Sequence, residues 1–453
     1  MVKRIEKYFS WGSVGLLLLT ITYTLFQLDE EALWDVHSFR GILSVIVVVV
    51  VAEIYLRRKI LFEKLSFFEG LFAVLAAAIV ASYLYNFKLN LGLSIVLLLF
   101  CLGYGIYKRT FYKPHPIMLS LLAFTVMKLL SVLWATDKTT AFDHIDYYCF
   151  FLFLPVISCF YRPEKTTLRA FIYIPFFISL LLLLLTVADY IFLMHYLGKP
   201  LVSFLTLDKT YLGQHLDTGF ATYYQPIIWS ITFHPSKIAW GFLVIWTMGY
   251  WLWREEKGRV INTFQFLLYT FLMAMIALIL QARVTILGIF ILMSLFVWVS
   301  LMKRVKKPKL IALFTVIVFV IGSLITKEII TKTTFFNDEG RVKVNEAALV
   351  HFKEHPFIGG GAGYETQLIH SLNINLNSLH NEFLTALSDQ GLLGLSFLLL
   401  FHVLVIYYGL KNKYFLGIYV LLAFSIFNAT EGVMGLPICI PFFLFCLIPP
   451  KQT

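Results

Sequence analysis

Charged residues are scarce in this sequence: 14% of its 453 residues are Asp, Glu, Lys or Arg, whereas 59% are hydrophobic. Roughly a quarter of the residues of a soluble domain are charged, so the composition excludes a soluble globular protein. Apolar runs of roughly 20 residues recur along the chain, and each is long enough as a helix to cross a bilayer. The sequence therefore predicts an all-α fold, a polytopic membrane helical bundle.

Processing and metal-binding signatures are also missing. No small-residue cleavage site follows the first apolar run, Trp11–Leu28, so we interpret that run as a membrane span and not as a signal peptide. No Cys-x-x-Cys pair occurs, and the cysteines all lie in apolar runs, which favours packing over disulfides or metal binding. They are Cys101, Cys149, Cys159, Cys439 and Cys446. We find no internal repeat, which argues against the repeated halves typical of many transporters.

The net charge of +11 does not predict a nucleic-acid partner, because the basic residues are spread over many short loops. Such loops set membrane topology and bind anionic lipid headgroups. If the N-terminus is cytoplasmic, about 24 of the 37 basic residues fall in cytoplasmic loops, as the positive-inside rule requires. This arrangement predicts that both termini are cytoplasmic.

The apolar runs predict about 12–14 spans in a single integral membrane domain, residues 1–453. They lie near residues 12–28, 41–56, 66–85, 89–107, 116–135, 145–161, 168–195, 236–253, 261–281, 284–301, 309–326, 391–410, 414–429 and 433–448. The predicted topology places two long segments outside, residues 196–237 and 327–390, together with a tight turn at 281–283. Loops longer than about 15 residues are usually functional or separately folded, so 327–390 is the expected catalytic loop, mostly helical and periplasmic.

Inside this loop, apolar spacing predicts an amphipathic helix over Lys343–Phe352, which His355-Pro356 terminates. The run Gly359–Gly363 predicts irregular backbone, either a flexible turn or a cradle for phosphate. A second helix is expected to begin at Asn377 or Ser378, to carry His380 in its first turn, and to stop at Gly391.

Two residues are the main candidates for chemistry. His380 at a helix N-terminus is expected to stay neutral and able to accept a proton; the alternative is a structural role against the bundle. Arg283 stands between two apolar runs, where an arginine is costly unless it faces a polar cavity or a ligand such as phosphate. The alternative for Arg283 is an interfacial side chain that reaches lipid headgroups.

Other polar residues are weaker candidates. Arg341 either contacts substrate or pairs with the acids just before it. Lys128 and Glu431 lie in apolar surroundings and require polar partners that the sequence does not identify. An acidic group either binds a cation or belongs to a solvated loop, and the absence of Asp-x-Asp favours the loop. This group comprises Asp137, Asp143, His144 and Asp146.

Several short motifs follow one another in the C-terminal half. Arg283 is followed by Gly340-Arg341, then Pro356-Phe357-Ile358-Gly359-Gly360-Gly361, His380-Asn381-Glu382-Phe383-Leu384 and Gly391-Leu392-Leu393-Gly394-Leu395. Their order, spacing and topology over about 278–410 resemble the shared region of bacterial O-antigen ligases, O-antigen polymerases and related O-oligosaccharyltransferases.

The resemblance implies a glycosyltransferase of the bacterial inner membrane that needs no metal or cofactor and inverts the anomeric centre. It would move a glycan from undecaprenyl diphosphate to an acceptor hydroxyl, on lipid A core in ligases or on another glycan in polymerases. His380 would be the base and Arg283 would hold the diphosphate, with Arg341 as a further contact. The implied substrate-binding set also contains His234, Lys237, Asn381 and Gly361.

The sequence departs from the family pattern in the outer loop before residue 237. No arginine lies between Arg169 and Arg254, and Ser236 stands where Asn is usual. Lys237 or Lys209 would have to replace the missing charge, although lysine lacks the bidentate fork of arginine. A polymerase with a glycan acceptor and, in another class, a polysaccharide transporter or flippase therefore remain alternatives.

Overall fold

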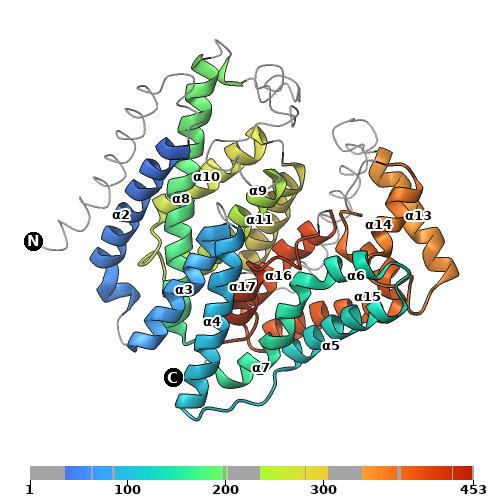
Figure 1. The fold of residues 1–453 in the computed structure, drawn as a ribbon. Helices are drawn as coiled ribbons and strands as arrows, with labels where there is room; N and C mark the ends of the chain where they lie inside the picture. The colour runs from blue at the N-terminus through green and yellow to red at the C-terminus, as the bar shows by residue number, and fades with distance from the viewer. Residues whose placement is uncertain are drawn as a thin grey trace, which may run out of the picture.

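The computed structural model describes residues 36–62, 65–83, 87–196, 200–202, 235–280, 282–304, 339–374, 379–430 and 432–450. The elements in these residues are helices, and no strand occurs among them (Figure 1). The predicted all-α class is therefore confirmed.

Five helices in the described residues are long and apolar enough to cross a membrane. They are α4 (Phe87–Tyr107), α5 (Pro116–Leu130) continued by the 3₁₀ helix η2 (Ser131–Trp134), α8 (Lys165–Tyr196), α11 (Arg283–Arg304) and α15 (Glu382–Lys411). Three apolar helices are shorter, namely α3 (Phe67–Tyr83), α10 (Thr263–Ile279) and α16 (Phe415–Asn428), and α2 (Val36–Leu61) and α9 (Pro235–Glu255) complete the long elements. These helices confirm a polytopic bundle. The number of spans stays a prediction, because 12–28 and 309–326 lie outside the described residues.

Two predicted spans are not single crossing helices. The span expected at 433–448 contains only α17 (Cys439–Cys446), and eight residues at 1.5 Å each cover about 12 Å, which is too short. The span expected at 145–161 consists of the 3₁₀ helix η3 (Asp146–Leu152) and α7 (Phe153–Phe160), preceded by α6 (Lys138–Ile145). The helix pair made of α6 and 148–160 is bent by 56°, so at most it forms one broken span.

Helices α9 and α11 each run antiparallel to α16, which fixes the two ends of the bundle. Trp240 on α9 packs on Phe424 of α16 with ring centroids 5.0 Å apart, while Trp251, further along α9, packs near Tyr414. Phe296 on α11 packs on Tyr419, whereas a Cβ on Gly288 would meet Ile426. Thus α9 and α11 both begin at the end of the bundle where α16 finishes.

The opposite end, which we call the basic end, collects the basic loops. Arg57 donates to the carbonyl of Val260 at 2.7 Å, and Arg169 pairs with Glu256 at 2.9 Å. The end of α15 lies there too, because Tyr414, just after it, packs near Trp251 toward the end of α9, and Tyr408 packs on His115, just before α5. Of the predicted basic loops, those after α2, α9 and α15 therefore share one end of the bundle, whereas the basic residues at the N-terminus and at 305–309 lie outside the described residues.

The long loop carries α13 (Glu339–Glu354) and α14 (Tyr364–Ser371), which lie beside α15 at the edge of the molecule (Figure 1). Helix α13 confirms the predicted amphipathic helix: Val344 and Ala348 are buried, and the helix ends just before His355. Helix α14 was not predicted. The second predicted helix begins later than expected, at Glu382, and continues past Gly391 with a kink, where φ is +64° and ψ is −157°.

Candidate functional site

His380 lies just before α15 and not in its first turn, so that part of the prediction is wrong. Asn381 is the N-cap of α15, and its Oδ1 accepts the backbone N–H groups of Phe383 and Leu384 at 3.1 and 3.2 Å. The backbone of His380 is left-handed, with φ +52°. This conformation costs a non-glycine residue energy, so it persists only where the surrounding structure imposes it. The imidazole is partly exposed.

Glu365 of α14 holds the chain on both sides of His380. Its Oε2 accepts the backbone N–H of Leu379 at 3.2 Å and the hydroxyl of Thr385 at 2.7 Å. Leu379 is the residue before His380, and Thr385 is in the first turn of α15. These bonds fix the backbone that presents the imidazole.

Glu382, two residues after His380, is anchored from α5 and η3. Its Oε1 accepts the hydroxyl of Tyr148 at 2.6 Å and lies 3.4 Å from Nζ of Lys128. All three side chains are buried. A buried ion pair persists only if its charges are matched and hydrogen-bonded, so Lys128 receives here the acidic partner that its apolar span required.

A second, half-buried contact extends this arrangement to α6. Nδ1 of His144 lies 3.3 Å from Oε1 of Glu365, and its Nε2 lies 2.7 Å from the hydroxyl of Thr366. Burial raises the pKa of the Glu365 carboxyl, but hydrogen bonds from His144 and Thr385 and the nearby charges outweigh burial, and the pKa falls below its ordinary 4.5. Glu365 is therefore ionised at neutral pH. We call Lys128, His144, Tyr148, Glu365, Glu382, Thr385 and Asp389 the polar network.

The glycine run packs against the kink in α15 and is not free to move. The backbone N–H groups of Gly360 and Gly361 donate to the carbonyls of Ser388 and Asp389, each at 2.9 Å. A Cβ on Gly359 would approach the carbonyl oxygen of Ser388 to 2.5 Å, and one on Gly361 would approach Ala135 Cα to 2.4 Å. Both residues also have positive φ, so only glycine fits.

Two further backbone N–H groups near the predicted phosphate cradle are also bonded to α15. The N–H of Gly363 donates to Oδ2 of Asp389 at 3.2 Å, and that of Glu365 donates to Oδ1 at 3.3 Å. Four N–H groups of this segment are thus directed to α15 and not toward a ligand. Gly361 has a packing role here, and its contact with substrate stays a prediction.

Arg283, Arg341 and Lys237 lie toward the end of the bundle opposite the basic end. Arg283 is the first residue of α11 and Lys237 the third of α9, the two helices that begin where α16 finishes. Nη1 of Arg341 donates to the carbonyl of Thr430, just after α16, at 3.0 Å. The predicted pairing of Arg341 with the acids before it stays a prediction, because Asp338 lies outside the described residues.

His380 lies toward this same end. A Cβ on Gly432, two residues after Thr430, would lie 3.4 Å from Oε2 of Glu382. The start of α15 therefore adjoins the loop that accepts the Arg341 guanidinium. His380, Asn381, Arg283, Arg341 and Lys237 are each partly exposed, so they are accessible at this end.

The remaining candidates have simpler outcomes. Asp137 is exposed, in agreement with a solvated loop, and it caps α6: its carboxylate accepts the N–H of Thr139 at 2.9 Å and the hydroxyl of Thr140 at 2.6 Å. Asp143 is exposed, and nothing is described of the Asp146 side chain. His234, Lys209 and Glu431 lie outside the described residues. The five cysteines are free, as predicted.

Comparison with known families bears on this end of the molecule. Residues 268–399 match the family model described as O-antigen ligase. Over these residues the chain is similar to the O-antigen ligase family. The match contains Arg283, Arg341 and His380, whereas Lys237 precedes it. No curated protein matches the chain.

Sequence reasoning missed the acidic residues that build this part of the matched region. Glu382 stands inside the motif that contains His380, and Glu365 and Asp389 stand in the same loop, which carries few acids. The available signal was Lys128: a lysine within a predicted span requires an acidic partner nearby in space. The sequence identifies the need for that partner but not its position 254 residues later.

Proposed function

We propose that this protein transfers a glycan from undecaprenyl diphosphate to an acceptor hydroxyl at the periplasmic face of the bacterial inner membrane. The observation that carries the proposal is that the O-antigen ligase match contains both His380 and Arg283, which also lie toward one end of the bundle. The basic end would then face the cytoplasm, consistent with the positive-inside rule.

In this mechanism His380 accepts the proton of the acceptor hydroxyl as its oxygen attacks the anomeric carbon. The bond from that carbon to the diphosphate oxygen breaks, and the configuration inverts. Arg283 stabilises the negative charge that develops on the leaving diphosphate, for which its planar, permanently charged fork is suited. Arg341 and Lys237 contribute further positive charge, and Asn381 and Glu365 hold the backbone of His380 in position.

The test is transfer in vitro from a defined polyprenyl-diphosphate glycan by protein purified in detergent. We expect His380→Ala to lower the rate by about 10²–10⁴-fold, the usual contribution of a general base, and Arg283→Ala to lower it by about 10²–10³-fold. The matched control is His370→Ala, an exposed histidine of α14 outside the proposed site. Wild-type rates in the correctly folded His380→Ala protein would remove His380 from the mechanism.

The acceptor is identified in the same assay. Lipid A core and free glycan are offered separately, and the product is examined for capped core or for longer chains. Capped core supports the ligase-like activity that we propose, since the matching family model is described as an O-antigen ligase. Longer chains without capped core would make the protein a polymerase with the same chemistry.

A further inference from the structure

The end of α13 carries two histidines and a glutamate that the proposed transfer does not use. His351 and Glu354 lie in the last turn of the helix, and His355 is the residue after it. Residues three and four positions apart share one helix face, and the helical hydrogen bond from the N–H of His355 to the carbonyl of His351 is 3.0 Å long. One ligand atom from each side chain lies within 4.8 Å of the other two.

His351 is the fixed member of this group. It is 5% exposed, and its ring stacks on Tyr364 of α14 with centroids 3.7 Å apart and an interplanar angle of 19°. Its Nε2 is buried and has no hydrogen-bond partner among the described residues. A buried nitrogen without a partner costs free energy, and a ligand bound to this atom would remove that cost.

Gly360 packs against this imidazole. A Cβ at position 360 would stand 2.8 Å from Nε2 of His351 and 2.5 Å from Cγ and Cδ2 of Tyr364, so only glycine fits beside the two stacked rings. The N–H of Gly360 is bonded to Ser388, which holds the glycine in place. The position of the His351 ring is thus fixed by α14 and by the segment that packs on the kink of α15.

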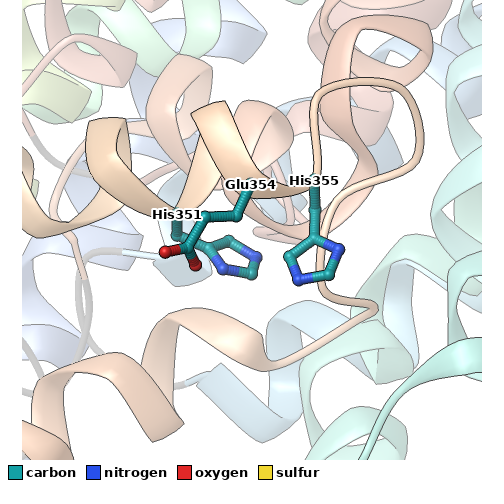
Figure 2. A group of neighbouring side chains, drawn as sticks. All are labelled: His351, Glu354 and His355. Carbon is teal, nitrogen blue, oxygen red and sulfur yellow. The ribbon is translucent and has the colours of Figure 1, made fainter.

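Glu354 and His355 are exposed and free to adjust around the fixed imidazole. The rings of His351 and His355 lie side by side with centroids 4.9 Å apart, and the Glu354 side chain extends beside His351 (Figure 2). Around a tetrahedral zinc ion with bonds of about 2.0–2.1 Å, donor atoms stand about 3.4 Å apart. Rotation of two exposed side chains is enough to bring the donors from their present spacing to this one.

We infer that His351, Glu354 and His355 form a binding site for a divalent transition metal of the zinc class. Two imidazole nitrogens and one carboxylate oxygen are ligands that zinc accepts, and they leave the fourth position open to water. Hard cations such as magnesium prefer oxygen ligands and are expected to bind poorly.

The site is separate from the transfer chemistry, so its test measures binding and not activity. Protein purified through a non-histidine affinity tag is stripped with a chelator and titrated with zinc chloride by calorimetry, with magnesium chloride as the comparison. We expect one equivalent of zinc to bind and to raise the unfolding temperature. Magnesium is expected to do neither.

The variants distinguish this site from other histidines on the surface. His355→Ala and Glu354→Gln alter exposed side chains and are expected to fold, yet to bind zinc at least about tenfold more weakly, since even outer-shell changes cost 10–100-fold. His351→Phe keeps a ring against Tyr364 and is expected to lose binding as well. His370→Ala is the matched control and is expected to bind like wild type. Unchanged zinc affinity in His355→Ala would overturn the assignment.

Discussion

Helix α9 and the first half of α15 are both buried, but they are held in place by different interactions. Helix α9 packs through large rings: Trp240 and Trp246 are fully buried, and Tyr250 stacks on Phe296 with centroids 3.5 Å apart. The first half of α15 is held by the polar network: side chains from α5, α6 and η3 converge on Glu365 and Glu382, and Asp389 accepts the backbone N–H groups of Gly363 and Glu365.

The two modes serve different purposes. Apolar packing in a bilayer is adaptable, because lipid tails are as apolar as the side chains that they replace. A buried polar network is satisfied in very few arrangements, and losing one member is costly. The polar network therefore fixes the backbone around His380, whereas the α9 core fixes the general position of the helices.

The largest effect is expected from breaking the ion pair between Lys128 and Glu382. Lys128→Met leaves the Glu382 carboxylate buried without its cation, which is expected to lower the free energy of unfolding by about 3–5 kcal/mol and to reduce transfer as His380 loses its fixed position. Denaturant unfolding in mild detergent measures the change. Thr125→Val on the same helix is the control, because it removes only a local bond to Leu121.

The double variant Lys128→Met with Glu382→Gln sharpens this result. Removing both charges is expected to restore part of the stability, since no uncompensated charge remains. If the two single changes simply add, the pair does not act as a unit and the role given to the polar network is wrong.

An intermediate effect is expected at Glu365, and it depends on pH. Because folding lowers the pKa of this carboxyl below 4.5, the stabilisation is present above pH 4.5 and is lost as the pH falls through the folded-state pKa. Glu365→Gln is expected to cost about 1.5–3 kcal/mol of unfolding free energy at neutral pH. The difference between the two proteins should shrink in acid. A constant difference from pH 7 to pH 3 would contradict the assignment of an ionised Glu365.

The smallest effect is expected from breaking a hydrogen bond between α9 and α10, within the apolar packing around α9. Nε1 of Trp246 on α9 donates to the hydroxyl of Thr270 on α10 at 2.8 Å. Thr270→Val is expected to lower the free energy of unfolding by about 0.5–1.5 kcal/mol and to leave the transfer rate per folded molecule unchanged. A loss of transfer as large as that of Lys128→Met would remove the distinction between the two regions.

Most of the apolar helices and the end of α13 followed from apolar spacing and from His355-Pro356, because these signals are local, whereas α13 begins at Glu339, four residues before the predicted start. The irregular backbone at Gly359–Gly363 was equally predictable, but its contact with the kink at Gly391 was not, since backbone hydrogen bonds between distant segments leave no local pattern. The same holds for Glu365 and Lys128, whose partners are remote in sequence. The prediction put His380 in the first turn of α15, whereas it precedes the helix, because Asn381 is the N-cap and not Asn377 or Ser378.

The central claim is that His380 and Arg283 act on one sugar diphosphate, and cross-linking tests it most directly. Arg283→Cys and His380→Cys are combined in a background whose five native cysteines are replaced, and a bifunctional thiol reagent no longer than a sugar diphosphate is added. We predict an intramolecular cross-link in high yield, which a lipid-linked glycan donor suppresses. Labelling of each cysteine by a monofunctional reagent without any cross-link between them would contradict the account.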